Sequence, residues 1–328
     1  MVEAMRRHLG IGLVALLVSS AAFGTSGPFA KSLMEAGWTP GLVVLLRISG
    51  AALVLLPFTL WSLRGRWAQV RRELPLAIAY GIFAVAGAQL GYFQAVERLA
   101  VGVALLIEYL GIVLVVLAVW ALTRRRPSGF VLAGVVLALA GLVLVLDVAG
   151  TARLDLVGLA WGLLAATGLA SHYVLAARET SLPPASFAGL GLLVGAVVLS
   201  VLGLLDVIPM RAGSGEVVLA NVAVPAWAPV LELVLVAAVL AYILGIVGAR
   251  HLGSTLASFI GLTEVLFAIL FAWLLLGELP RPIQLVGAVV LLAGVAAVRV
   301  GEQRTARSAA PEAETVLEPD FTAHSPVA

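Results

Sequence analysis

The sequence predicts an all-α integral membrane protein with ten transmembrane helices, arranged as two inverted five-helix repeats. Three observations lead to this prediction. Apolar residues make up 62% of the 328 residues and charged residues only 12%, which lies far from the composition of soluble globular proteins. Several apolar runs with few or no charges reach about 20 residues, the length of a helix that crosses a bilayer. Finally, the second half repeats the first with different charges in the loops.

The internal repeat is visible when residues 99–145 are aligned with residues 252–298 at a fixed offset of 153. Uncommon residues then coincide, in the pairs Trp120 and Trp273, Pro127 and Pro280, Gly134 and Gly287, and Gly141 and Gly294. Between the matched helices the first copy has three arginines at 124–126, where the second has the acidic turn 277–279. Arginine-rich loops stay on the cytoplasmic side. The two copies are therefore expected to cross the membrane in opposite directions.

The first repeat is expected to occupy residues 1–150. Its five spans have the approximate limits 9–30, 40–61, 74–96, 99–122 and 128–147. The first span could also be a cleaved signal peptide, because Arg6 and Arg7 precede an apolar run that ends in small residues. However, the run continues past Gly24, and its small residues parallel those of the sixth span at an offset of 146. We therefore expect the first span to be the repeat partner of the sixth.

The second repeat is expected to occupy residues 151–301. Its spans have the approximate limits 156–177, 184–205, 227–249, 254–276 and 282–300. The longest connection, residues 206–225, is expected to be an external loop with room for a short interfacial segment. Residues 302–328 are polar and have no apolar period, which predicts a disordered cytoplasmic tail.

The distribution of basic residues predicts the orientation. With the N-terminus in the cytoplasm, most of the 20 Lys and Arg residues fall inside. Those outside are Lys31, Arg98, Arg153, Arg211 and Arg281, and Arg47 lies within a span. Both termini are then cytoplasmic, and an odd number of helices per repeat inverts the second repeat. We expect a multi-pass protein of the inner (plasma) membrane.

These features resemble the drug/metabolite transporter superfamily, and specifically its EamA family. The stretch from Leu262 to Glu278, followed by Pro280, resembles the ninth and tenth helices of that family. Glu108-Tyr109-Leu110 is similar to the fourth helix of the threonine/homoserine-exporter-like branch. The resemblance implies two inverted five-helix repeats that export amino acids, metabolites or drugs, or import small metabolites, by alternating access.

The chain departs from the family pattern at one feature. Family members often carry a proline shortly after the glutamate of the fourth and ninth helices, whereas Ile112 and Val265 stand at the corresponding positions here. We therefore expect the breaks in these two helices to be absent.

Ionisable side chains inside the spans are the first candidates for a site, because a charge at the bilayer centre is costly. Glu108 and Glu264 should both reach the middle third of the membrane, and as near-equivalents in the repeat they could face a common cavity. There they would bind a substrate ammonium group or a proton, or pair within the bundle. Arg47 should lie about 12 Å below Pro40, where it could snorkel to the surface, pair or contact substrate. His172 is a candidate proton relay, or is satisfied by a neighbouring hydroxyl or carbonyl.

Polar and aromatic side chains complete the candidate set. Gln89 and Tyr92 are three residues apart and should share the face of a cavity. The remaining candidates for stacking or hydrogen bonding, each also explicable as packing, are Tyr109, Trp161, Ser26, Tyr242 and Ser258.

Several functions are not supported by the sequence. The chain has no cysteine, no phosphate-binding loop and no zinc-binding histidine pair, so we expect no cofactor, metal or enzymatic activity. Its arginines lie in short loops and indicate topology rather than nucleic-acid binding. The glycines at 134, 141, 287 and 294 indicate tight packing between the repeats or a homodimer contact.

The sequence as a whole predicts a secondary active transporter of a small polar metabolite, an amino acid or related compound that is exported, with protons as a candidate coupling ion. A multidrug exporter of cationic compounds is the alternative within transport. An intramembrane enzyme or a scaffold is the alternative outside it.

Overall fold

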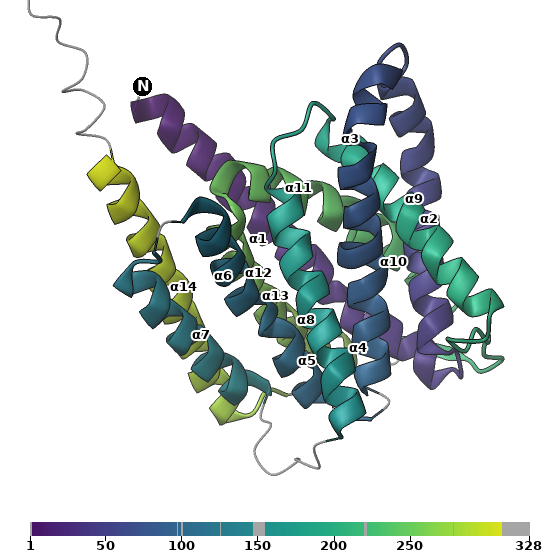
Figure 1. Ribbon diagram of the computed structural model, residues 1–328. Coiled ribbons are helices and arrows are strands. Elements are labelled where there is room, and N and C mark those ends of the chain that lie inside the picture. Colours follow the sequence, from purple (N-terminus) through teal and green to yellow (C-terminus); the bar gives the residue numbers. More distant parts are fainter. Residues whose placement is uncertain are drawn as a thin grey trace, which may run out of the picture.

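The structure is a computed structural model that describes residues 2–96, 98–99, 101–124, 126–146, 155–219, 222–277 and 279–309. Nearly all of these residues are helical (Figure 1). Within the described residues, ten helical stretches are long and apolar enough to cross a membrane, and they coincide with the ten predicted spans. The all-α, ten-helix prediction is confirmed.

The two halves contain the same succession of elements. The first half consists of α1 (Val2–Glu35), α2 (Pro40–Ser62), α3 (Trp67–Ala79), η1 (Tyr80–Gly87), α4 (Ala88–Val96), α5 (Val101–Tyr109), α6 (Gly111–Thr123) and α7 (Gly129–Leu146). The second half consists of α8 (Leu156–Ala176), α9 (Pro184–Leu204), α10 (Trp227–Val234), η2 (Leu235–Leu240), α11 (Ala241–Leu252), α12 (Ser254–Gly261), α13 (Thr263–Leu276) and α14 (Pro282–Ala309). In each half the third span contains a π-helical segment, η1 or η2, and the fourth span is divided in two.

The expectation that the fourth and ninth spans are unbroken is wrong. The amide of Leu110 donates to the carbonyl of Ile107 (3.1 Å), and the amide of Leu262 donates to the carbonyl of Phe259 (3.2 Å). This three-residue spacing is that of a 3₁₀ turn, so each helix tightens without a proline. A glycine flanks each break and lets α8 approach: a Cβ on Gly111 would lie 2.5 Å from the carbonyl oxygen of Ala166.

Contacts between the halves follow a symmetric scheme. The first helix of each half packs on the third and fourth spans of the other half: α1 on α11 and α13, and α8 on α4, η1, α5 and α6. The second helices, α2 and α9, pack on each other, as do the fifth helices, α7 and α14. The hydroxyls of Ser62 and Ser186 lie 2.9 Å apart, which joins the end of α2 to the start of α9. These two helices therefore run antiparallel.

Glycines hold α7 and α14 together within the chain. Gly134 adjoins Gly294, and Gly141 adjoins Gly287, so these two helices also run antiparallel. Small residues at this spacing let two backbones approach closely. The four glycines thus serve packing between the halves, which was one of their two expected roles.

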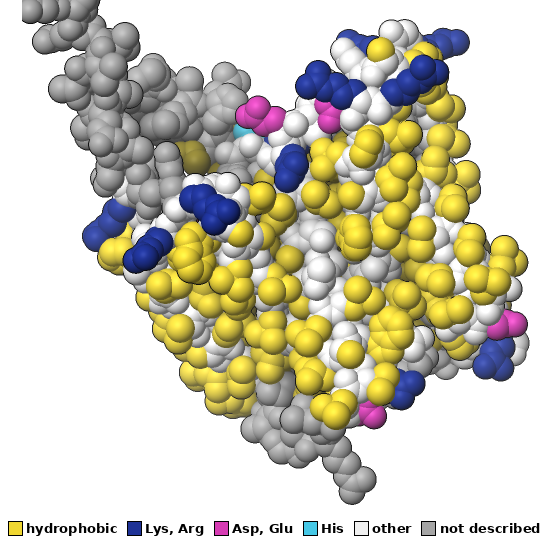
Figure 2. All heavy atoms as spheres, in the orientation of Figure 1, with side chains coloured by type: hydrophobic (Ala, Val, Ile, Leu, Met, Phe, Trp, Pro, Cys, Tyr) yellow, Lys and Arg dark blue, Asp and Glu magenta, His cyan; other side chains and the backbone are white. Residues whose placement is uncertain are grey.

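The outer surface of the bundle is apolar. Leu53, Leu156 and Leu204 expose 66%, 78% and 84% of their area, and apolar side chains cover the flank of the molecule in Figure 2. Lys and Arg side chains gather at the end of the bundle where the N-terminus lies (Figures 1 and 2). Such a belt between polar ends is suited to contact with lipid.

The connection between α9 and α10 contains a feature that the sequence analysis did not predict. Strands β1 (Val217–Leu219) and β2 (Val222–Val224) form an antiparallel hairpin. Val217 is 3% exposed and joins Leu33, Val43 and Leu233 in a small second core. The hairpin therefore covers one end of α1 and α10.

The predicted tail is partly helical. Helix α14 continues through Ala309, so residues 302–309 extend the tenth span instead of beginning a disordered segment. Residues 310–328 of the predicted tail lie outside the described residues.

The glycine contact between α7 and α14 can be tested with matched alanine substitutions. A Cβ on Gly141 would lie 2.4 Å from the backbone nitrogen of Leu291, whereas Gly129, on the same helix, has nothing within 4 Å. Gly141→Ala should destabilise the protein by about 1–3 kcal/mol because the helices must separate. Gly129→Ala should be neutral or slightly stabilising. Thermal unfolding in detergent measures both, and equal melting temperatures would contradict this account of the packing.

Candidate functional site

A cavity of about 100 Å³ lies between the two halves and is lined by both. Its walls come from the first helices of both halves, from α2, and from the third and fourth spans, which contain a π-segment or a break. The lining residues are Phe23 and Ser26 of α1, Arg47 of α2, Ala84 of η1, Ala88 and Gln89 of α4, Glu108 of α5, Leu169, His172 and Tyr173 of α8, Tyr242 of α11, and Glu264 of α13. None of these residues belongs to α7 or α14, which identifies that pair as scaffold.

The two helix breaks place both candidate glutamates at the cavity. Glu108 lies in the last turn of α5, next to the first break, and Glu264 lies in the first turn of α13, just after the second. A carboxylate in the first turn of a helix is favoured by the helix dipole. Within the described part of the chain, the one ion pair joins Lys31 to Glu35 at the surface. Neither cavity glutamate is therefore neutralised by a protein cation within 4 Å.

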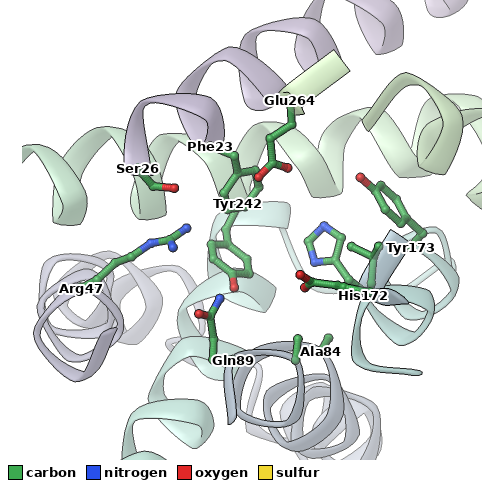
Figure 3. A pocket seen from close by; sticks show the side chains of 12 residues that line it. Phe23, Ser26, Arg47, Ala84, Gln89, His172, Tyr173, Tyr242 and Glu264 are labelled. Atoms are coloured by element: carbon green, nitrogen blue, oxygen red, sulfur yellow. The ribbon is translucent and has the colours of Figure 1, made fainter. Parts of the chain in front are cut away.

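Arg47 is held inside the bundle and does not snorkel to its surface. Only 9% of its area is exposed. Its Nη2 donates to the carbonyl of Ala237 in η2 (2.7 Å), and its Cζ lies 5.5 Å from the centre of the Phe23 ring. Its Nε is buried and has no hydrogen-bond partner. Figure 3 shows the guanidinium directed toward the cavity, and no carboxylate of the described residues lies within 4 Å of it.

His172 lies on the opposite side of the cavity from Arg47, with Tyr242 between them (Figure 3). Its Nδ1 is hydrogen-bonded to the hydroxyl of Tyr80 (2.9 Å). The rings of Tyr173 and Tyr242 meet the imidazole edge-on, at centroid distances of 5.0 and 5.7 Å. A neighbouring hydroxyl thus satisfies one imidazole nitrogen, as one of the two sequence-based interpretations expected.

The structure brings most of the predicted site residues together. Those that line the cavity are Glu108, Glu264, Arg47, Gln89, His172, Ser26 and Tyr242. Four others are not among the lining residues, namely Tyr92, Tyr109, Trp161 and Ser258. The ring of Tyr92 packs edge-on against Phe93, and the hydroxyl of Ser258 donates to the carbonyl of Thr255. Gln89 and Tyr92 were expected to line the cavity together. In the structure Gln89 lines it and Tyr92 does not.

Sequence reasoning missed Phe23 and Tyr173, which line the cavity, and Tyr80, which bonds to His172. An aromatic residue in an apolar span gives no signal that distinguishes a cavity wall from core packing. It also missed Glu232 on α10, although this carboxyl lies inside the predicted span 227–249. Glu108 was selected because an ionisable side chain inside a span is costly, and Glu232 meets the same criterion. The sequence therefore contained the signal that could have identified Glu232.

Comparisons with known proteins identify a family profile that matches each half of the chain and a solved structure with a similar fold. The sequence profile of the EamA-like transporter family matches residues 10–147 and again residues 156–300, one match for each half. A search of curated proteins found no match. Among solved structures, one titled "Crystal structure of protein" superposes with a TM-score of 0.69 over 90% of this chain and 98% of its own. The two sequences are 20% identical, so this likeness concerns the fold.

The bond between Tyr80 and His172 can be tested by removing one hydroxyl. Tyr80 is fully buried, so Tyr80→Phe leaves the imidazole Nδ1 without its partner. The expected cost is about 1–3 kcal/mol of unfolding free energy. Tyr92→Phe is the matched control, because the Tyr92 hydroxyl has no hydrogen bond among the described residues. Thermal unfolding should separate the two variants, and identical melting temperatures would show that the bond contributes nothing.

Proposed function

The chain belongs to the EamA-like transporter family, and from that premise we propose that it is a secondary active transporter that exports a small zwitterionic metabolite, such as an amino acid. One observation carries the choice of solute: a single buried cavity presents a guanidinium and two carboxyl groups that are not paired with one another.

A solute with both charges would complete this site. The guanidinium of Arg47 can bind a carboxylate through two parallel hydrogen bonds. The carboxylates of Glu108 and Glu264 can accept hydrogen bonds from an ammonium group. An unpaired charge in a buried site is costly, and a zwitterion would remove that cost at both ends of the cavity. Ser26 and Gln89 add neutral polar groups on the walls.

Transport would proceed by rocking of the two halves around this cavity. The antiparallel pairs α2–α9 and α7–α14 support a second half that is inverted relative to the first. The basic end of the bundle would face the cytoplasm, with both termini on that side of the inner membrane. The gradient of the substrate or of protons would supply the energy.

Aromatic lining favours a second candidate, an exporter of cationic aromatic drugs. Phe23, Tyr173 and Tyr242 could stack on such a compound. However, drug-sized ligands occupy pockets of about 300–1,000 Å³, and this cavity holds about 100 Å³. The size supports the smaller solute.

A thermal-shift screen would distinguish the two candidates. The purified protein would be heated with each of the common amino acids, with the corresponding decarboxylated amines, and with cationic aromatic drugs. An amino acid present at 100 times its Kd should stabilise the folded state by about 2.7 kcal/mol. The amines should have a smaller effect, because they offer nothing to Arg47. Stabilisation by drugs alone would favour the multidrug exporter.

Transport in proteoliposomes would test the charged residues directly. Arg47→Gln and Glu108→Gln should each lower uptake of the amino acid found in the screen about 10- to 100-fold, because a hydrogen bond to a charged group contributes about 1.5–3 kcal/mol. Glu35→Gln is the control, since Glu35 is exposed and remote from the cavity. An unchanged rate and an unchanged pH dependence in Glu108→Gln would exclude Glu108 from the mechanism.

A further inference from the structure

A carboxyl group that does not line the central cavity lies between α1 and α10. One oxygen of Glu232 is hydrogen-bonded to the hydroxyl of Thr25 on α1. The other oxygen, Oε2, is buried and has no hydrogen-bond partner. No cation lies within 4 Å of the carboxyl among the described residues. An ionised carboxylate in this position would be poorly satisfied, because a charge inside a membrane span normally needs a partner.

Counting hydrogens identifies the protonation state that fits these contacts. A threonine hydroxyl carries one proton. The Thr25 hydroxyl lies within hydrogen-bond distance of two acceptors, the Glu232 oxygen and the carbonyl of Ala22 (2.7 Å). The single hydroxyl proton can be donated to only one of these acceptors at a time, and a carbonyl cannot donate. Both contacts are satisfied together when the Glu232 carboxyl is protonated and donates to the Thr25 oxygen while the Thr25 hydroxyl donates to Ala22.

The charged groups around Glu232 are few. Helix α10 packs against α1, α2 and η2. Near this contact α1 carries Lys31 and Glu35, which pair with each other at 4.0 Å, and η2 has no ionisable side chain. From α2, Arg47 acts on Glu232 through space without an ion pair. Loss of the Glu232 proton would therefore leave a carboxylate that has the Thr25 hydroxyl and the field of Arg47 to stabilise it, but no ion pair among the described residues.

The other half of the protein contains a counterpart of this bond. His172 of α8 is bonded to Tyr80 at the start of η1, as Thr25 of α1 is bonded to Glu232 just before η2. In both cases one side-chain hydrogen bond joins the first helix of one half to the third span of the other. In both cases one partner is a side chain of a titratable type, a histidine or a glutamate.

We propose that Glu232 is a proton-binding site distinct from the central cavity, and that it exchanges its proton with water when α1 and α10 separate. The carboxyl O–H bond breaks, the proton passes to a water molecule as hydronium, and a carboxylate remains. Reprotonation restores the bond to Thr25 and closes the contact. Its role in the transport cycle rests on the proposed function, whereas the protonation of Glu232 does not.

Infrared spectroscopy of the purified full-length protein tests the protonation without any substrate. The spectrum of wild type minus Glu232→Gln at neutral pH should show the carbonyl stretch of a protonated carboxyl. Thr25→Val should shift that band, because the carboxyl loses its hydrogen-bond acceptor. Glu216→Gln, in the exposed loop before β1, is the control and should remove only carboxylate bands. A Glu232 difference that contains only carboxylate bands would overturn the proposal.

Transport tests the coupling role. Uptake of a radiolabelled mixture of the common amino acids would be measured as external pH is varied. Wild type and Glu216→Gln should share one pH profile. Glu232→Gln should lose the part of that profile that Glu232 contributes, with KM unchanged, because an amide cannot release the proton. A pH profile of Glu232→Gln identical to that of wild type would show that the bond between Thr25 and Glu232 is only a structural contact. Because the infrared measurement of Glu232 needs no solute, failure of one proposal leaves the other intact.

Discussion

The cost of an unsatisfied charge inside hydrocarbon governs the design of this protein. Water is absent from the bilayer core, so each polar group there must find its partner within the protein or in a hydrated cavity. Arg47 meets this condition only in part: one nitrogen reaches a backbone carbonyl and its Cζ faces an aromatic ring, but its Nε has no partner. Glu108 and Glu264 have no ion-pair partner within the described residues. Together these groups give the cavity polar side chains that are not paired with one another.

The π-segments and helix breaks lie in spans that contribute side chains to the cavity. A regular α-helix uses all its interior backbone groups and presents side chains at fixed angles. The π-segments η1 and η2 and the breaks at Leu110 and Leu262 alter those angles where the spans pass the cavity. Helices α7 and α14 lie away from the cavity and show no such interruption. The uninterrupted helices α1, α2 and α8 also line the cavity, so the irregularities are confined to the third and fourth spans.

The contact between the halves combines extensive apolar packing with few side-chain hydrogen bonds. The bonds Thr25–Glu232 and Tyr80–His172 occupy equivalent places in the two halves, and each includes a titratable group. The apolar contacts are indifferent to protonation, whereas these two bonds depend on it. In the mechanism proposed above, a change in protonation would act on these two bonds without disturbing the apolar core of either half.

The sequence by itself determined the ten spans, the duplication and the ionisable residues inside the spans. Such residues are costly in hydrocarbon and therefore need a partner or a function. Hydropathy fixes spans because hydrocarbon excludes polar side chains, and the same exclusion identified Arg47, Glu108 and Glu264. Offsets between copies predicted that Gly134 and Gly287 belong to equivalent helices. The sequence also led to one error at Ile112 and Val265, where the missing prolines suggested unbroken helices that the 3₁₀ turns contradict.

Only the tertiary structure decided which side chains share one cavity. Gln89 and Tyr92 lie three residues apart on α4, yet only Gln89 reaches the cavity. Glu232 becomes informative once Thr25, far away in the sequence, is seen to bond with it. Such relations depend on the rotation of each helix about its axis and on how closely its neighbours approach. Those quantities are set by packing between the halves, which an almost uniformly apolar sequence does not encode in its local pattern.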